Sequence, residues 1–229
     1  MTPRAVMIFA AGLGTRMGAL TRDRPKPLIE VAGRPLIDHA LALARAAGIP
    51  RVVVNTHAHA GQLEAHLARV APEVVVSYEP ALLETGGGLK RALPLLGDGP
   101  VLTLNADMVW SGPNPLRALA AAWAPGMGAL LCLVPRAAAV GHGGPGDFSR
   151  GADGRLARRG AAAVANFVYA GAQIIDPAPV AAVADAVFSL NPVWDGLIAE
   201  GRLGGVVHPG RWVDVGRPEG IALAEAALA

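Results

Sequence analysis

The chain has 229 residues, a mass of 23.3 kDa and a formal net charge of +2 at pH 7. Hydrophobic residues make up 52% of the sequence and charged residues 17%, which excludes a disordered chain. No apolar run reaches the roughly 18 residues of a membrane helix, and basic and aromatic residues are too scattered for a nucleic-acid surface. The one cysteine, Cys132, lies in an apolar run and allows no internal disulfide, so we expect a reducing, cytoplasmic setting.

Apolar runs of strand length alternate with helix-like segments, a pattern typical of a mostly parallel sheet covered by helices. We expect strands over residues 5–11, 51–56, 73–78, 101–105, 129–134, 164–175 and 211–215. We expect helices over residues 35–47, 61–70, 89–96, 116–123, 180–186 and 192–200. The glycine-rich stretch from 141 to 148 is predicted to be a loop. No pattern in the sequence indicates an oligomeric state.

A glycine turn follows the first strand and leads into a polar stretch with two cations. Residues 10–27 read Ala-Ala-Gly-Leu-Gly-Thr-Arg-Met-Gly-Ala-Leu-Thr-Arg-Asp-Arg-Pro-Lys-Pro. Glycines let backbone amides approach an anion closely, and Arg16 and Lys26 can neutralise phosphate oxygens. Pro25 and Pro27 are expected to hold Lys26 in an extended segment. A tight turn without a ligand is the alternative, but this loop is long enough to wrap a triphosphate.

Spacing separates this loop from the two commonest phosphate-binding loops. The P-loop needs a second glycine five residues after the first, followed by lysine, whereas Met17 and Ala19 stand at those positions after Gly12 and Gly14. In the dinucleotide fingerprint, Met17 occupies the place of the third glycine. The loop therefore belongs to neither class.

The two motifs at either end of this stretch resemble the signature of the sugar-phosphate nucleotidyltransferases. They are Ala10-Ala11-Gly12-Leu13-Gly14-Thr15-Arg16-Met17 and Arg24-Pro25-Lys26-Pro27-Leu28. The resemblance implies a Rossmann-like, doubly wound mixed sheet whose loop holds a nucleoside triphosphate. It places Ala11, Gly12, Gly14, Thr15 and Arg16 around that nucleotide, and Lys26 beside the reacting phosphates.

Two aspartates that follow apolar strands are the candidate metal ligands. Asp107 stands at the carboxyl end of the strand over 101–105, where open α/β sheets bind ligands, and Asp214 closes the apolar run from 211. Each alone could cap a turn. In the resembled family, the aspartates of an Asn-x-Asp and a Trp-x-Asp-x-Gly motif both bind Mg²⁺, and both positions match here. Nucleotidyl transfer to a sugar phosphate needs no general base, because the attacking phosphate is already anionic near pH 7.

Two further stretches narrow the substrate. Glu84-Thr85-Gly86 opens a run of three glycines at an expected helix start, where a base or ribose can approach the backbone, with Thr85 as a helix cap the alternative. By resemblance, this region binds the nucleotide, while Asn105, Asp147 and Gly171 contact the sugar phosphate or its sugar. The pairing of Leu83–Gly88 with Gly146-Asp147-Phe148 is similar to the N-acetylmuramate-1-phosphate uridylyltransferases of bacterial cell-wall recycling.

The resemblance thus predicts UTP and N-acetylmuramate 1-phosphate as substrates, Mg²⁺ as cofactor, and UDP-N-acetylmuramate and pyrophosphate as products. One transferase domain is expected over residues 1–229, without a C-terminal β-helix, divided into a nucleotide-binding half (about 1–107) and a sugar-binding half (about 108–229). Where hexose-phosphate relatives carry a Glu-Lys pair, this chain has Ala161-Ala162-Ala163-Val164, which disfavours glucose or mannose.

Four alternatives stay open. They are a hexose-1-phosphate nucleotidyltransferase using GTP or dTTP, a catalytically silent nucleotide-sugar sensor, an NAD-binding oxidoreductase, and a zinc site on His57, His59 and His66. Met17 disfavours the oxidoreductase, and the histidines lack the companions of a zinc motif. Cys132 is expected to be a core residue.

Overall fold

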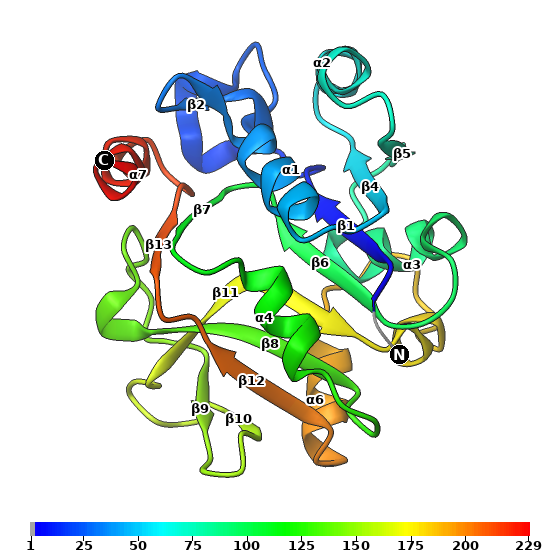
Figure 1. The fold of residues 1–229 in the computed structure, drawn as a ribbon, viewed down its shortest axis with the longest axis vertical. Helices are drawn as coiled ribbons and strands as arrows, with labels where there is room; N and C mark the ends of the chain where they lie inside the picture. The colour runs from blue at the N-terminus through cyan, green and yellow to red at the C-terminus, as the bar shows by residue number, and fades with distance from the viewer. Residues whose placement is uncertain (1–2) are drawn as a thin grey trace.

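The computed structural model describes residues 3–229, which form a mixed β-sheet with helices on both faces (Figure 1). The strands of the main sheet are β1 (Ala5–Phe9), β4 (Arg51–Thr56), β5 (Val75–Tyr78), β6 (Val101–Asn105), β8 (Ala129–Pro135), β9 (Phe148–Arg150), β10 (Leu156–Arg158), β11 (Phe167–Ile175) and β12 (Leu203–Val207). This 9-stranded sheet runs in the order β10-β9-β11-β6-β1-β4-β5, with β8 pairing to both β11 and β12. Strands β6, β1, β4 and β5 are parallel, whereas β11 is antiparallel to β6 and β8.

Two short ribbons and the helices complete the fold. The ribbons pair β2 (Glu30–Val31) with β3 (Arg34–Pro35), and β7 (Met108–Ser111) with β13 (Arg211–Asp214). The α-helices are α1 (Leu36–Ala46), α2 (Ala60–Val70), α3 (Glu84–Leu96), α4 (Pro115–Ala122), α5 (Pro177–Ala181), α6 (Asn191–Ala199) and α7 (Glu219–Leu228). The 3₁₀ helices are η1 (Thr15–Thr21), η2 (Lys26–Leu28) and η3 (Arg136–Ala138).

Alternating side chains of β1 show how the sheet is buried on both faces. Val6 and Ile8 join the cluster that includes α1, α2 and α4, while Ala5 and Met7 join the cluster that includes α3 and α6. These four side chains are almost fully buried, and a buried valine or isoleucine contributes about 1.5–3 kcal/mol. The parallel strands are therefore fixed in place, and their carboxyl ends meet at one edge.

A third apolar cluster lies away from the sheet. It contains Met17 of η1, Val213 of β13, Val215 and Ala224 of α7. Met17 is 1% exposed, so the residue at the position of the fingerprint glycine buries the glycine turn in the same apolar cluster as β13. Met17, which replaces the third glycine of the dinucleotide fingerprint, thus places the glycine turn in one apolar cluster with the last strand, β13.

The predicted mixed sheet is confirmed, and the expected strands are present with shifted ends. Strand β12 was not predicted because Gly204 and Gly205 interrupt its apolar pattern; a Cβ on Gly205 would lie 2.5 Å from Leu133 Cδ1. Helix α7 and the short strands β7, β9 and β10 were also not predicted.

Two local predictions were wrong. The segment around Lys26 is a 3₁₀ turn rather than extended, because the amides of Leu28 and Ile29 donate to the carbonyls of Pro25 and Lys26. The helix expected over 180–186 lies earlier in the chain, at α5, where Asp176 caps it by accepting a hydrogen bond from the amide of Ala178. Among residues 3–229, no helix has both the length and the apolarity required to cross a bilayer.

Candidate active site

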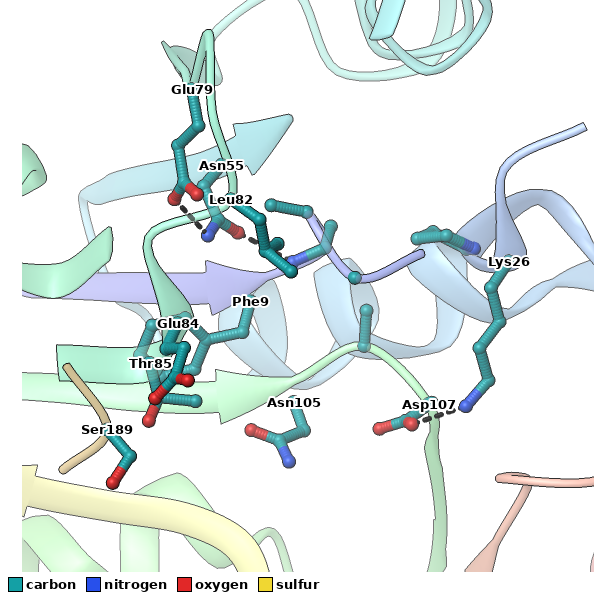
Figure 2. A pocket seen from close by; sticks show the side chains of 15 residues that line it. Phe9, Lys26, Asn55, Glu79, Leu82, Glu84, Thr85, Asn105, Asp107 and Ser189 are labelled. Atoms are coloured by element: carbon teal, nitrogen blue, oxygen red, sulfur yellow. Dashed lines mark hydrogen bonds and ion pairs between the residues drawn. The ribbon is translucent and has the colours of Figure 1, made fainter. Parts of the chain in front are cut away.

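A cavity of about 390 Å³ opens at the carboxyl ends of the parallel strands (Figure 2). Its wall comes from the ends of β1, β4, β5 and β6, from the start of α3 and from the segment before α6. The lining residues are Phe9, Ala10, Ala11, Gly12, Lys26, Pro27, Asn55, Glu79, Leu82, Glu84, Thr85, Asn105, Ala106, Asp107 and Ser189. Ligands of open α/β sheets bind at this edge.

The glycine turn contributes backbone to the cavity at its first residues only. Ala11 and Gly12 line it, whereas Gly14 and Thr15 turn the chain into η1. Gly14 has φ +66°, and a Cβ there would lie 2.9 Å from the side chain of Thr21, so both the backbone and the space require glycine. The Thr21 hydroxyl donates a hydrogen bond to the Gly14 carbonyl at 3.0 Å, which fixes the turn.

Lys26 and Asp107 meet at one end of the cavity, as Figure 2 shows. Lys26 Nζ donates to Asp107 Oδ2 at 2.5 Å, and both side chains are largely buried. Lys26 is presented by the 3₁₀ turn η2, and Asp107 follows the end of β6. The spacing that singled out these two residues therefore leads to one ion pair beside the glycine turn.

Asp214 reaches the same place from the far end of the chain. The antiparallel pairing of β13 with β7 sets Asp214 opposite Met108, and the amide of Val215 donates to the carbonyl of Asp107 at 3.0 Å. Asp214 Oδ1 is buried and has no hydrogen-bond partner within residues 3–229. Burial first, and the Asp107 carboxylate second, raise the pKa of Asp214, while Lys26 and Arg16 oppose them.

Arg16 lies beside Asp214 rather than in the first cavity. A Cβ on Gly216 would lie 2.7 Å from Asp214 Oδ1 and 3.1 Å from Arg16 Nη1. Both side chains therefore lie against the backbone of Gly216, where only glycine leaves room for them. The four predicted catalytic side chains, Arg16, Lys26, Asp107 and Asp214, are thus gathered around the turn between β6 and β7.

Only the first two residues of α3 reach the cavity, and Gly86 does not line it. Glu84 and Thr85 line the cavity, but Gly86 packs against the segment before α6: its Cβ would lie 2.4 Å from the ring of Phe188. The amides of Gly86 and Gly87 donate to the carbonyl of Phe188. Thr85 does not cap the helix; its hydroxyl accepts from the amide of Leu190. Close chain packing accounts for Gly86 and Gly87.

The predicted sugar contacts fall into two groups. Asn105 lines the cavity, and Gly171, with φ +80° in an irregular part of β11, lies against it: a Cβ there would be 3.0 Å from Asn105 Nδ2. Asp147 is outside the lining. Its Oδ2 accepts from the amide of Tyr169 at 2.8 Å, so this carboxylate ties the glycine-rich loop to β11.

Comparison with known proteins supplies the family. The family model for a MobA-like NTP transferase domain matches residues 6–193. This chain belongs to that family. It is 45% identical over 99% of its length, and over 98% of the other protein, to the N-acetylmuramate alpha-1-phosphate uridylyltransferase of Caulobacter vibrioides. It is 37% identical to the protein of the same name in Neisseria meningitidis, with 92% of each chain covered.

A solved structure shows the same fold at low identity. The crystal structure of HddC from Yersinia pseudotuberculosis, complexed with GMP-PN, superposes with a TM-score of 0.78, at 19% identity and with both chains fully covered. This likeness shows the fold, whereas the family and the two relatives above show that the chain is a nucleotidyltransferase.

The donor set of this nucleotidyltransferase fits a magnesium ion. Mg²⁺ is bound through one or two carboxylates, with phosphate oxygens and water filling the remaining positions. Asp107 and Asp214 supply two carboxylates, and the buried Oδ1 of Asp214, which has no hydrogen-bond partner among residues 3–229, is available to a metal ion. Residues 3–229 hold no cluster of three or more His, Cys, Asp or Glu side chains arranged for a metal, so a bound ion would depend on phosphate oxygens as well.

Two polar residues that the sequence motifs do not include, Asn55 and Glu79, also line the cavity. Asn55, at the end of β4, accepts from the amide of Ala10 at 2.6 Å and donates to Glu79 Oε1 at 2.7 Å. Glu79 Oε2 accepts from the amide of Leu83 at 3.2 Å. The sequence does contain a signal for this pair: Asn55 lies near the end of one apolar strand and Glu79 directly follows the next. Both strands end at the edge of the sheet where Asp107 lies.

The histidines and the cysteine have structural roles. His57 Nδ1 contacts the Glu79 carbonyl at 2.9 Å, and His66 Nε2 contacts Asp38 at 2.8 Å. His59 adopts φ +51° before α2. With no metal cluster among the described residues, the zinc alternative is wrong. Cys132 is buried within β8, as predicted.

Proposed function

We propose that this enzyme joins UTP and N-acetylmuramate 1-phosphate to give UDP-N-acetylmuramate and pyrophosphate. The observation that carries the proposal is the meeting of Lys26, Asp107 and Asp214 beside the glycine turn, in a chain of this family. The choice of substrates is supported by two relatives of that name, one of them 45% identical over 99% of the chain. The nucleoside triphosphate and the sugar phosphate would share the cavity above β1 and β6.

The proposed reaction is a direct displacement at the α-phosphorus. A phosphate oxygen of the sugar 1-phosphate forms the new bond, and the bond from the α-phosphorus to the bridging oxygen breaks, so pyrophosphate leaves with that electron pair. The attacking phosphate carries its own charge near pH 7, and no proton has to be removed. The chain's task is to align the two phosphates and to oppose their repulsion.

Each charged residue has a separate part in that task. Lys26 lies within 2.5 Å of Asp107 and would neutralise oxygens of the reacting phosphates. Arg16, on the far side of Asp214, would hold the leaving pyrophosphate together with backbone amides of Ala11 and Gly12. Asp107 and Asp214 would hold Mg²⁺, which supplies charge neutralisation to the phosphate oxygens when bound.

The remaining contacts follow from the cavity wall. Glu84 and Thr85 would contact the nucleoside, and Asn105 the sugar phosphate, because they line the cavity away from Lys26. Gly171 would support Asn105 from behind. In the proposed division, residues up to about 107 bind the nucleotide and residues from about 108 bind the sugar. Asp147 would act by fixing the loop that borders the sugar.

We also propose that the reaction takes place in the cytoplasm as a step of peptidoglycan recycling. The single, buried Cys132 supports a reducing compartment. N-acetylmuramate is a cell-wall sugar, and linking it to UDP would return it to the pool of wall precursors.

The test is a pyrophosphate-release assay that crosses UTP, dTTP, GTP and CTP with a panel of sugar 1-phosphates. We expect the highest kcat/KM for UTP with N-acetylmuramate 1-phosphate. A preference for GTP with mannose 1-phosphate would overturn the substrate assignment and favour the hexose-1-phosphate alternative. Absence of turnover with every pair, in an enzyme that binds UTP, would favour a nucleotide-sugar sensor.

A further inference from the structure

A second cavity, of about 540 Å³, lies on the other side of Asp214. Its wall combines the loop at 141–144 with the residues that follow β13 and with the end of the glycine turn. Arg16, His142, Asp214 and Arg217 are its side chains that can hydrogen-bond. The proposed phosphate chemistry assigns Arg16 and Asp214 but leaves His142 and Arg217 without a role.

The two arginines of this second cavity, Arg16 and Arg217, have no acceptor for their side chains among residues 3–229. Neither Arg16 nor Arg217 forms a side-chain hydrogen bond or an ion pair with any residue from 3 to 229, and both are exposed. His142 Nε2 is buried and likewise unpartnered in this part of the chain. By contrast, Lys26 in the first cavity is already paired with Asp107. Two guanidinium groups therefore face open space next to a proposed metal ligand.

Glycines hold this second cavity in a fixed shape. Gly141 has φ +76°, and a Cβ on it would lie 2.4 Å from the carbonyl oxygen of Asp214, so only glycine allows the loop to approach β13 this closely. The amide of Asp214 donates to the Val140 carbonyl at 3.0 Å, and the ring of His142 lies 6.5 Å from that of Trp212. Gly216 keeps the space open between Arg16 and Asp214.

The chemistry of the substrate indicates what this arrangement binds. N-acetylmuramate 1-phosphate carries two anionic groups, the phosphate and the carboxylate of its lactyl ether. The phosphate must lie near Lys26 and Asp107 in order to react. The carboxylate needs its own cation or hydrogen-bond donors, because a carboxylate that loses water without a partner is strongly disfavoured.

We propose that Arg217, with His142 beside it, binds the lactyl carboxylate of the sugar substrate and so selects N-acetylmuramate over sugars that lack it. This inference rests on the function proposed above. Arg217 and His142 both belong to the half of the chain that is proposed to bind the sugar. Arg16, which leads out of the glycine turn, stays with the pyrophosphate.

The test compares two sugars that differ only in the lactyl ether. Pyrophosphate release is measured with saturating UTP and Mg²⁺ while N-acetylmuramate 1-phosphate or N-acetylglucosamine 1-phosphate is varied. The enzymes are wild type, Arg217→Gln and Arg217→Lys, with Arg155→Gln as the matched control. Arg155 is an exposed arginine on the turn between β9 and β10 and lines neither this cavity nor the first one. Thermal unfolding of each variant is recorded alongside.

We expect Arg217→Gln to lower the ratio of kcat/KM for the muramate over the glucosamine substrate by about tenfold to a hundredfold, mainly through KM. Arg217→Lys should recover part of the ratio, since the positive charge remains, and Arg155→Gln should leave it unchanged. A second variant, His142→Asn, should lower the ratio by a smaller factor.

Two other results overturn the inference. If Arg217→Gln lowers both kcat/KM values equally, Arg217 contacts a phosphate that both reactions share. If neither value changes, the second cavity does not bind the substrate. Both results require a wild type that uses N-acetylmuramate 1-phosphate; a wild type that uses N-acetylglucosamine 1-phosphate alone overturns the proposed function together with this inference.

Discussion

The variant Asn55→Asp tests the buried hydrogen-bond chain that joins the glycine turn to the start of α3. Asn55 is 3% exposed and Glu79 is fully buried. In the native protein, the Asn55 amide accepts from the Ala10 amide at 2.6 Å and donates to Glu79 Oε1 at 2.7 Å. Aspartate keeps the size and the acceptor for Ala10 but turns the donor toward Glu79 into a second carboxylate oxygen.

The size of the effect follows from proton binding. Two buried carboxylates at this separation are stable only if they share one proton, as carboxylate dyads do. In the unfolded chain, both groups lose their protons near pH 4, so holding one proton in the folded state costs about 1.36 kcal/mol for each pH unit above that value. The loss in the free energy of unfolding should be about 1.4 kcal/mol at pH 5 and about 4 kcal/mol at pH 7.

The direction of the pH dependence follows because the shared proton of the variant's carboxylate pair has a higher pKa in the folded state than in the unfolded chain. The proton-sharing pair is stable at low pH, and that stability is lost as the pH rises. Urea unfolding of wild type and Asn55→Asp at pH 5, 6 and 7 measures the gap at each pH.

The double variant Asn55→Asp, Glu79→Gln is the matched control. In this variant, the amide at position 79 donates to the carboxylate at position 55, which reverses the native hydrogen bond. It should recover most of the stability, and its difference from wild type in the free energy of unfolding should not depend on pH. A gap that is constant between pH 5 and pH 7, or a double variant no more stable than the single one, would refute the reasoning.

Three further changes test other parts of the molecule. Asp107→Asn should lower kcat for pyrophosphate release by about 10²–10³-fold while the protein stays folded; unchanged turnover would remove Asp107 from the proposed site. Glu84→Gly should raise the free energy of unfolding in urea by about 1 kcal/mol, because Glu84 has a left-handed backbone with φ +61°, which glycine adopts without strain. His59→Gly, at φ +51° and outside the cavity, is the control. A loss of stability in both variants would contradict the strain argument. Burial raises the pKa of the Cys132 thiol to about 12, so a thiol reagent at pH 8 should label it only after unfolding; rapid labelling of the native enzyme would argue against the packing of β8.

The parts of the site that sequence predicts well are those fixed by a general rule of parallel sheets. Asp107 and the glycine turn were expected together because β1 and β6 both end at the ligand-binding edge, and these strands are paired from Ala5 with Val101 to Phe9 with Asn105. The predicted helices that cover β1 also formed, since their apolar spacing matches the buried positions. Local pattern and general topology suffice for this half of the fold.

The parts that sequence did not predict depend on pairings between distant segments. Strand β7 has four residues, and only its antiparallel partner β13, about a hundred residues later, makes it a strand and brings Asp214 to Asp107. The apolar run that Asp214 closes was a weak signal by itself, and the family motif decided its selection. Likewise, Gly86 is explained by Phe188, Gly87 by the Ala186 carbonyl and Gly88 by the Glu79 carboxylate, and no local pattern reveals that these groups approach α3.

The same long-range contacts limit how far the glycine-rich loop can move. Its first end is fixed where the Asp214 amide donates to Val140, and its second end is fixed where the Ala165 amide donates to Pro145 at 2.8 Å. Gly146, at φ +86°, lies so close to the Ala165 carbonyl that a Cβ would be 2.4 Å away. A hinged lid would have to break one of these attachments. Any movement of this loop on substrate binding would therefore be limited to residues 142–144, the stretch that carries His142 at the second cavity.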